Sequence, residues 1–197
     1  MITYLATKNP GKLGEIATML AGSGLQLETY PAYRDPVEGS TSYVENALLK
    51  ARALREQLRA AGICAAVLAD DSGIELDALD GGPGVDSAYY AGAGASWPMR
   101  LETMMRVVRP LPEERRGARF VCVMAMILAD GREIVVEGEV CGRIVAESRG
   151  DHGFGYDPIF LYPPIGKTFG EIPEAEKNAL SHRGNAARAL LAALGAT

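Results

Sequence analysis

Apolar residues recur along this chain with two periods, and the two periods alternate through its first half. Residues 13–20 carry apolar side chains at i, i+3, i+4 and i+7, which is typical of a helix with one buried face. The same pattern predicts a second helix over 43–61 and a third that begins at Ser96 and Pro98. Strands are expected over 2–6, 25–30 and 63–69, and the last of these is apolar on both faces, as a central strand would be.

Two long apolar segments follow, over 119–129 and 133–140, and Asp130-Gly131 between them is a strong hairpin signal. A last helix is expected over 182–194. Helices that alternate with strands, followed by a long hairpin, predict an α/β fold with a long mixed β-sheet flanked by helices. We expect one domain over residues 1–197, formed by two lobes with a substrate cleft between them.

The charge balance argues against nucleic acid as a partner. The 197 residues include 20 Lys and Arg against 25 Asp and Glu, which gives a net charge of −5. A protein that binds a nucleic-acid backbone is usually basic, whereas a small anion needs only a local positive pocket.

No membrane partner is expected either. The longest apolar run, 120–129, is too short to cross a bilayer, and the first residues do not resemble a signal peptide. Cys64, Cys122 and Cys141 lie in apolar surroundings without a metal-binding spacing, so we expect buried free thiols in the reducing cytoplasm.

The first candidate site is the segment Thr7-Lys8-Asn9-Pro10-Gly11-Lys12, between a buried strand and a helix. The N-terminus of a helix attracts anions through its free N–H groups and its dipole, and two lysines add charge. Asn9 also suits the N-cap and Pro10 the first turn, so a plain capped turn is the alternative. The segment lacks the glycines of a phosphate-binding P-loop or a dinucleotide fold.

Acidic residues form the second candidate. Asp70 and Asp71 end a strand that we expect to be buried, and adjacent strand residues point to opposite faces, so only one can enter a given site. Carboxylates of this kind hold Mg²⁺ together with substrate phosphates, although a solvated turn would also explain them.

Two glutamates and a lysine complete this candidate. Ser42-x-x-Glu45 is a capping box, which gives Glu45 a structural explanation, whereas Glu38 lies in a loop without one and is the better metal candidate. Lys50, on the same expected helix as Glu45, points either to solvent or toward a phosphate.

The third candidate is aromatic and basic. Phe154 and Tyr156 offer stacking faces in a glycine-rich loop that ends at Asp157-Pro158, or they close the core as a plug. Lys177, His182 and Arg183 offer donors to a base carbonyl or a phosphate. A surface position at the start of a helix is the alternative for His182 and Arg183. Cations there are unfavourable, however, which favours an anionic or carbonyl partner for both residues.

Seven motifs in order resemble the inosine/xanthosine triphosphate pyrophosphatase family across nearly the whole chain. They are Thr7-x-Asn9-x-x-Lys12, Tyr43-Val-Glu45-Asn46-Ala47-x-x-Lys50-Ala51, Ala69-Asp70-Asp71-Ser72-Gly73, Gly82-Pro83-Gly84-Val-x-Ser87-Ala88, Phe154-Gly-Tyr-Asp157-Pro158, Glu176-Lys177-Asn178 and Ser181-His182-Arg183-Gly184. The resemblance implies Mg²⁺-dependent hydrolysis of ITP, dITP and XTP to the monophosphate and pyrophosphate, by a homodimer that removes non-canonical purine nucleotides.

The resemblance also implies a role for each candidate residue. Asp71 would be the general base and a metal ligand, with Glu38 as the other ligand and Glu45 as the alternative to it. The residues that would contact substrate are Thr7, Lys8, Asn9, Pro10, Gly11, Lys12, Lys50, Ser72, Phe154, Gly155, Tyr156, Asp157, Lys177, His182 and Arg183.

Three other readings stay open. A related pyrophosphatase could prefer pyrimidine or modified nucleotides, a nucleotide-binding module could have lost turnover, and a structural α/β protein could carry the motifs by chance. Turnover of a nucleotide panel separates them.

Overall fold

A computed structural model describes residues 1–39 and 41–195 of the chain. Its helices are α1 (Pro10–Met19), α2 (Tyr43–Ala60), α3 (Trp97–Val108), α4 (Glu174–Leu180) and α5 (His182–Ala193). Its strands are β1 (Ile2–Leu5), β2 (Gln26–Thr29), β3 (Ala66–Leu76), β4 (Pro83–Gly84), β5 (Gly117–Ile127), β6 (Glu133–Ile144), β7 (Phe160–Tyr162) and β8 (Lys167–Thr168).

These strands form one mixed sheet in the order β2-β1-β3-β5-β6-β7-β8, with β4 paired to β3 beside this path. β1 is parallel to both β2 and β3, whereas β7 is antiparallel to β6 and β8. The α/β fold with a mixed sheet is therefore confirmed.

The chain divides into two compact units, as the expectation of two lobes requires. The first unit comprises 1–71, 122–138 and 183–197, and the second comprises 72–121 and 139–182. The expected cleft and the single domain over 1–197 stay predictions.

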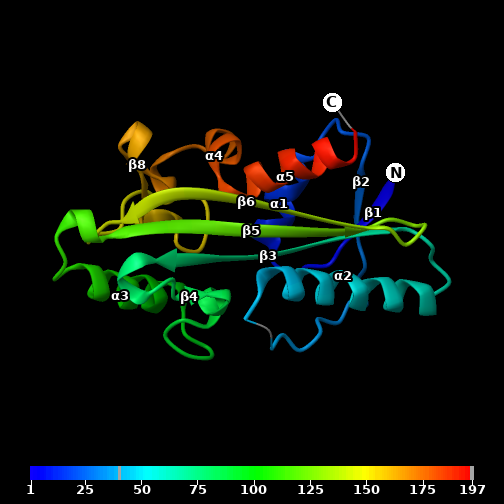
Figure 1. The fold of residues 1–197 in the computed structure, drawn as a ribbon, viewed down its shortest axis with the longest axis horizontal. Helices are drawn as coiled ribbons and strands as arrows, with labels where there is room; N and C mark the ends of the chain where they lie inside the picture. The colour runs from blue at the N-terminus through cyan, green and yellow to red at the C-terminus, as the bar shows by residue number, and fades with distance from the viewer. Residues whose placement is uncertain (40, 196–197) are drawn as a thin grey trace. The chain divides into compact units, whose positions relative to one another are not determined.

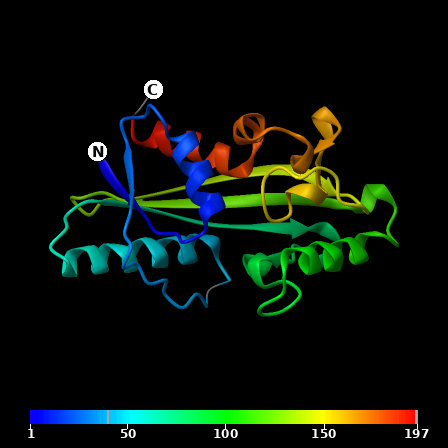
Figure 2. The ribbon, with the colours of Figure 1, turned by 180° about the vertical axis from the view of Figure 1, so that it is seen from behind.

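In the first unit, helices cover both faces of the strands. Figure 1 and Figure 2 show α2 on one face and α1 with α5 on the other. Successive strand residues alternate between the two cores: Leu68, Cys122 and Met124 pack with α1 and α5, whereas Val67 and Val123 pack with α2. This alternation makes the strands apolar on both faces, and it sends Asp70 and Asp71 to opposite faces further along β3.

The second unit has its own core. Met104 and Val108 of α3 pack with Ile74 and Leu76 of β3 and with buried residues of β5, β6 and β7. Tyr156, Ile159 and Phe169, from the segments around β7 and β8, complete the same cluster. The aromatic loop of residues 153–158 is thus anchored in this core.

The prediction for β3 was wrong at both ends. The strand begins at Ala66 rather than Ile63 because the Ile63 N–H donates to Leu58 O and continues the turn that ends α2. The strand also continues through Asp70 and Asp71 to Leu76. Lysine ammonium groups pair with both carboxylates, and this pairing offsets the free-energy cost of burying them.

The prediction for the cysteines was wrong in part. All three are free thiols, but only Cys122 is buried, and burial raises its pKa to about 12. Cys64 and Cys141 are exposed, the latter on the solvent side of β6. Across the described residues, the structure contains no helix that combines the length and apolar character needed to span a bilayer.

Candidate active site

The segment 7–12 forms a capped helix start. Asn9 is the N-cap of α1, and its side-chain oxygen accepts hydrogen bonds from the N–H groups of Gly11 at 2.9 Å and Lys12 at 3.4 Å. The Thr7 hydroxyl accepts a bond from the Asn9 N–H at 3.2 Å, and Pro10 occupies the first turn. Two of the N–H groups that could bind an anion are therefore already hydrogen-bonded to Asn9. The lysine side chains are then the main source of positive charge for an anion at this segment.

Asp70 ties the first of these lysines to the start of α5. The Lys12 ammonium lies 2.8 Å from an Asp70 oxygen, and an Arg183 nitrogen lies 3.5 Å from the same oxygen. A second Arg183 nitrogen pairs with Glu15 of α1. The anionic partner predicted for Arg183 thus includes two carboxylates of the chain itself.

Burial and charge oppose one another at Asp70. Removal of this fully buried carboxylate from water would raise its pKa, but the Lys12 ammonium and the Arg183 guanidinium outweigh that effect and lower the pKa well below its usual value. Asp70 is therefore ionised at neutral pH, and its role is to hold two cations.

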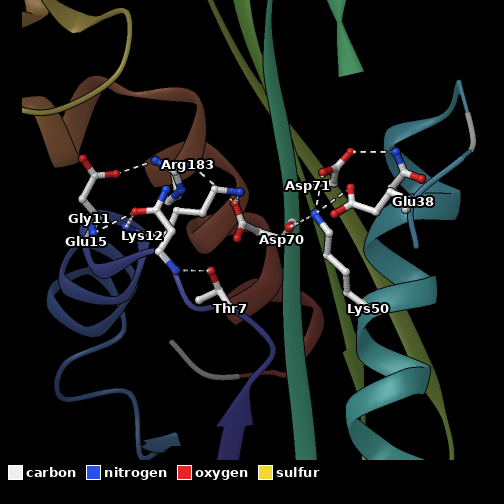
Figure 3. A network of polar contacts seen from close by, with 11 residues as sticks. Thr7, Gly11, Lys12, Glu15, Glu38, Lys50, Asp70, Asp71 and Arg183 are labelled. Atoms are coloured by element: carbon white, nitrogen blue, oxygen red, sulfur yellow. Dashed lines mark hydrogen bonds and ion pairs between the residues drawn. The ribbon is translucent and has the colours of Figure 1, made fainter. Parts of the chain in front are cut away.

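Asp71 belongs to a separate group on the opposite face of β3 (Figure 3). Its two oxygens accept hydrogen bonds from Lys50 at 2.7 Å and from the Asn46 amide at 3.3 Å. The Lys50 ammonium also lies 3.2 Å from Glu38 and donates to the Asp70 backbone oxygen. The prediction that only one of the adjacent aspartates enters a given cluster of side chains is confirmed, and Lys50 points toward the carboxylates.

Lys50 keeps its proton in this setting. Burial would lower the pKa of its ammonium, but the Asp71 carboxylate, with Asp70 and Glu38, raises the pKa above its usual value. Lys50 therefore cannot act as a base near neutral pH. Asp71 and Glu38 are the carboxylates paired with it.

Two carboxylates of the first unit, Glu38 and Asp71, are the candidates to hold a divalent cation. Across the described residues, no three His, Cys, Asp or Glu side chains are grouped to hold a metal. Glu38 and Asp71 nevertheless converge on one positive charge, the Lys50 ammonium. Two carboxylates that meet at one point, with phosphate oxygens to complete the shell, are a donor set that Mg²⁺ uses.

The other residues near this group are more exposed. Glu45 lies in the first turn of α2, where its N–H donates to the Ser42 hydroxyl at 3.4 Å, as expected for a helix cap. Lys8 pairs with Asp35 at 3.2 Å on the surface. Ser72, the next residue of β3, is half-buried.

The second unit contains a buried ion pair between α4 and the aromatic loop. The Lys177 ammonium lies 2.7 Å from an Asp157 oxygen, which also accepts a hydrogen bond from the Phe154 N–H at 2.8 Å. The same ammonium lies 5.1 Å from the centre of the Phe154 ring. Gly153 has a φ of +72°, and a Cβ there would overlap the Asp157 carboxylate, so the loop needs glycine at this position.

The remaining loop residues pack inward. Tyr156 is buried, donates from its hydroxyl to Ser87 O at 2.9 Å and meets the edge of Trp97. A Cβ on Gly155 would lie 3.4 Å from Trp97. Of the two alternatives that the sequence offered for this aromatic residue, the structure shows that Tyr156 closes the core. His182, at the start of α5, is buried with its ring stacked on Phe120.

Sequence reasoning missed two members of the first unit's network. Asn46 precedes Lys50 by four residues on α2, and Glu15 follows Lys12 by three on α1, so each pair shares a helix face. This spacing could have predicted that Asn46 and Glu15 lie beside the two lysines. The contacts of Asn46 with Asp71 and of Glu15 with Arg183 join segments far apart in the chain.

Comparison with known proteins identifies the family of this chain. The model of the Ham1 family matches residues 3–193. The chain belongs to the Ham1 family. It is 44% identical over 194 residues to a dITP/XTP pyrophosphatase of Pectobacterium atrosepticum, with 96% of each chain covered. It is 41% identical to a dITP/XTP pyrophosphatase of Exiguobacterium sibiricum, with 98% of this chain and 97% of the relative covered.

Solved structures agree with this membership. A HAM1 protein from Coxiella burnetii is 34% identical and superimposes with a TM-score of 0.87, with all of both chains covered. A nucleoside-triphosphatase/dITP/XTP pyrophosphatase from Mycobacterium abscessus is 39% identical with a TM-score of 0.73, and 97% of this Ham1-family chain and 99% of that chain are covered.

Proposed function

We propose that this protein hydrolyses non-canonical purine nucleoside triphosphates, namely ITP, dITP and XTP, to the monophosphate and pyrophosphate. The observation that carries the proposal is that the two adjacent aspartates of β3 have different partners. Asp70 pairs with Lys12 and Arg183. Asp71 accepts hydrogen bonds from Lys50 and Asn46, and Lys50 also pairs with Glu38. Relatives named dITP/XTP pyrophosphatase, aligned over nearly the full chain, support the same activity.

Phosphoanhydride hydrolysis depends on charge neutralisation and on an oriented water. Lys12 and Lys50 supply positive charge for the triphosphate. Asp71 accepts the proton of the attacking water, since Lys50 remains protonated and Asp70 is taken up by its two cations. Asn46 and Lys50 hold the two oxygens of Asp71, which fixes the carboxylate plane.

Charge also supports the proposal that Mg²⁺ is the cofactor. Three cations (Lys12, Lys50 and Arg183) face four carboxylates (Glu15, Glu38, Asp70 and Asp71) in the network of Figure 3. That set is net negative and would repel a triphosphate. Glu38 and Asp71 would hold the ion, which when bound neutralises phosphate charge and acidifies a water.

We assign base recognition to the second unit. The family resemblance implies that the base and sugar are held by Phe154, Gly155, Tyr156, Asp157, Lys177, His182 and Arg183. Of these, Phe154, Asp157, Lys177 and His182 are our candidates for the base. Hydrogen-bond donors favour the 6-oxo group of hypoxanthine and xanthine, and they leave the 6-amino group of adenine mispaired.

Pyrophosphate release from a panel of nucleotides tests this proposal. ITP, dITP, XTP, dATP, dGTP and dTTP are each incubated with Mg²⁺ or with EDTA. Fast, Mg²⁺-dependent release from ITP, dITP and XTP alone is expected. Preferred turnover of a pyrimidine would favour the related pyrophosphatase, and tight binding without turnover would favour the nucleotide-binding module.

Two further proposals follow the resemblance. We propose a homodimer, for which light scattering would give about twice the chain mass of 20.9 kDa. We also propose that the protein acts in the cytoplasm, where its three free cysteines would stay reduced.

A further inference from the structure

Phe120 and His182 form a parallel ring pair in the second unit. Their ring centres are 4.6 Å apart and the ring planes differ by 14°. Phe120 lies near the start of β5 and His182 is the first residue of α5, so the pair joins segments distant in the chain. Both residues are more than 90% buried.

The Phe120 ring is itself held from other sides. The Phe160 ring lies 4.5 Å away at an angle of 46°, and the Phe169 ring lies 6.2 Å away with its plane within 4° of that of Phe120. Phe160 and Phe169 are fully buried and contact each other at 5.0 Å. A close-packed interior leaves such rings little room to turn, so Phe120 is a fixed surface for the imidazole.

An imidazole needs such a surface if it is to recognise a base. Rotation of a histidine ring about its last bond has broad energy wells, so the backbone alone does not set its plane. The ring N–H bonds lie in that plane, and hydrogen bonds weaken steeply when they are misaligned. A fixed ring plane therefore fixes the direction in which His182 can donate or accept.

We infer that Phe120 is a positioning residue for substrate selectivity: it sets the plane of the His182 ring, and through it the recognition of the 6-oxo purine. This inference rests on the proposed function, in which His182 contacts the base. Phe120 itself needs no contact with the nucleotide for this role, and it lies outside the seven motifs.

Replacement of Phe120 by Leu tests the inference, and Phe160→Leu is its matched control. Both changes remove a phenyl ring from the same aromatic cluster, and the ring stacked on His182 in the structure is that of Phe120. Phe120→Leu should raise KM for dITP and lower the preference for dITP over dATP by about tenfold, the effect of one misaligned hydrogen bond, with kcat much less affected. Phe160→Leu removes one support of the Phe120 ring but leaves that ring on His182, so it should lower the preference much less than Phe120→Leu does. Phe120→Tyr, which keeps the ring, should retain most of the preference.

Proton NMR gives a readout that does not depend on activity. The chain has two histidines, His152 and His182, so their imidazole signals are readily assigned with a His152→Asn variant. The stacked Phe120 ring should shift the His182 ring protons upfield. Phe120→Leu should abolish this shift, and Phe160→Leu, which leaves the stacked ring in the protein, should preserve most of it.

The outcomes separate the inference from the proposed function. Equal loss of dITP preference in the two Leu variants, or an unchanged His182 signal in Phe120→Leu, would overturn the role of Phe120 while wild-type turnover of dITP stands. If the wild-type protein turns over neither dITP nor XTP, the proposed function fails, and the role of Phe120 in selectivity fails with it, whatever the NMR spectra show about the stack.

Discussion

Asp70 and Asp71 are adjacent in the chain but occupy different environments. Asp70 is enclosed, with Lys12 and Arg183 on one of its oxygens, and Asp71 lies on the other face of β3 against Lys50 and Asn46. Alternation along a strand was enough to predict that the two separate. It could not predict that Arg183 would pair with Asp70 and Glu15, because that contact depends on the packing of α5 against α1.

Asp71→Asn should lower turnover strongly and leave nucleotide binding largely intact. The amide keeps the size of the side chain but cannot accept the proton of the attacking water, so kcat should fall by roughly a hundredfold to ten-thousandfold. Calorimetry with dITP in Mg²⁺ should give a dissociation constant within about tenfold of the KM of the wild type. Asp35→Asn, at the surface pair with Lys8, is the control and should keep full activity. Full activity in Asp71→Asn would remove Asp71 from the mechanism.

The start of α1 is the element on which the phosphate proposal depends. Asn9 caps it through two backbone N–H groups. Asn9→Ala should therefore destabilise the protein by about 1 kcal/mol, as measured by urea unfolding, and should also raise KM for the triphosphate because the segment 7–12 loosens.

Ser96→Ala is the matched control for that change. Ser96 is the N-cap residue of α3, but its side chain makes no capping hydrogen bond, so the substitution should change the unfolding free energy by less than about 0.5 kcal/mol. Equal losses of stability in the two variants would contradict the capping role of Asn9.

Long periodic elements were predictable and short ones were not. The amphipathic pattern located α1, α2, α3 and α5, and the Asp-Gly turn located the β5–β6 hairpin. β7 and β8 have three and two residues, too few to show a period, and their pairing with β6 and with each other defines them. α4, with seven residues, precedes α5 with a single residue between them and carries the buried Lys177.

At the scale of the whole molecule, the buried charges predict how stability depends on pH. The pKa of Asp70 is lower in the folded protein than its reference value of 3.8. Its stabilising contribution is therefore fully present above that value and is lost as pH falls through the folded pKa. Asp70→Asn should cost about 3 to 5 kcal/mol at neutral pH, because it leaves buried cations poorly compensated.

The difference between wild type and Asp70→Asn should then narrow as pH falls below 3.8. Denaturant unfolding at a series of pH values measures it, and Asp35→Asn again serves as the control, with little effect at any pH because its ion pair is exposed. A difference that stays constant down to pH 2 would show that Asp70 is not the ionised partner of Lys12 and Arg183.

Phosphorus NMR of the wild-type reaction with dITP and Mg²⁺ tests the central claim most directly, since it identifies the bond that breaks. Our account predicts that the three triphosphate signals give way to one signal of the monophosphate and one of pyrophosphate. Signals of a diphosphate and orthophosphate, or an unchanged triphosphate, would contradict it.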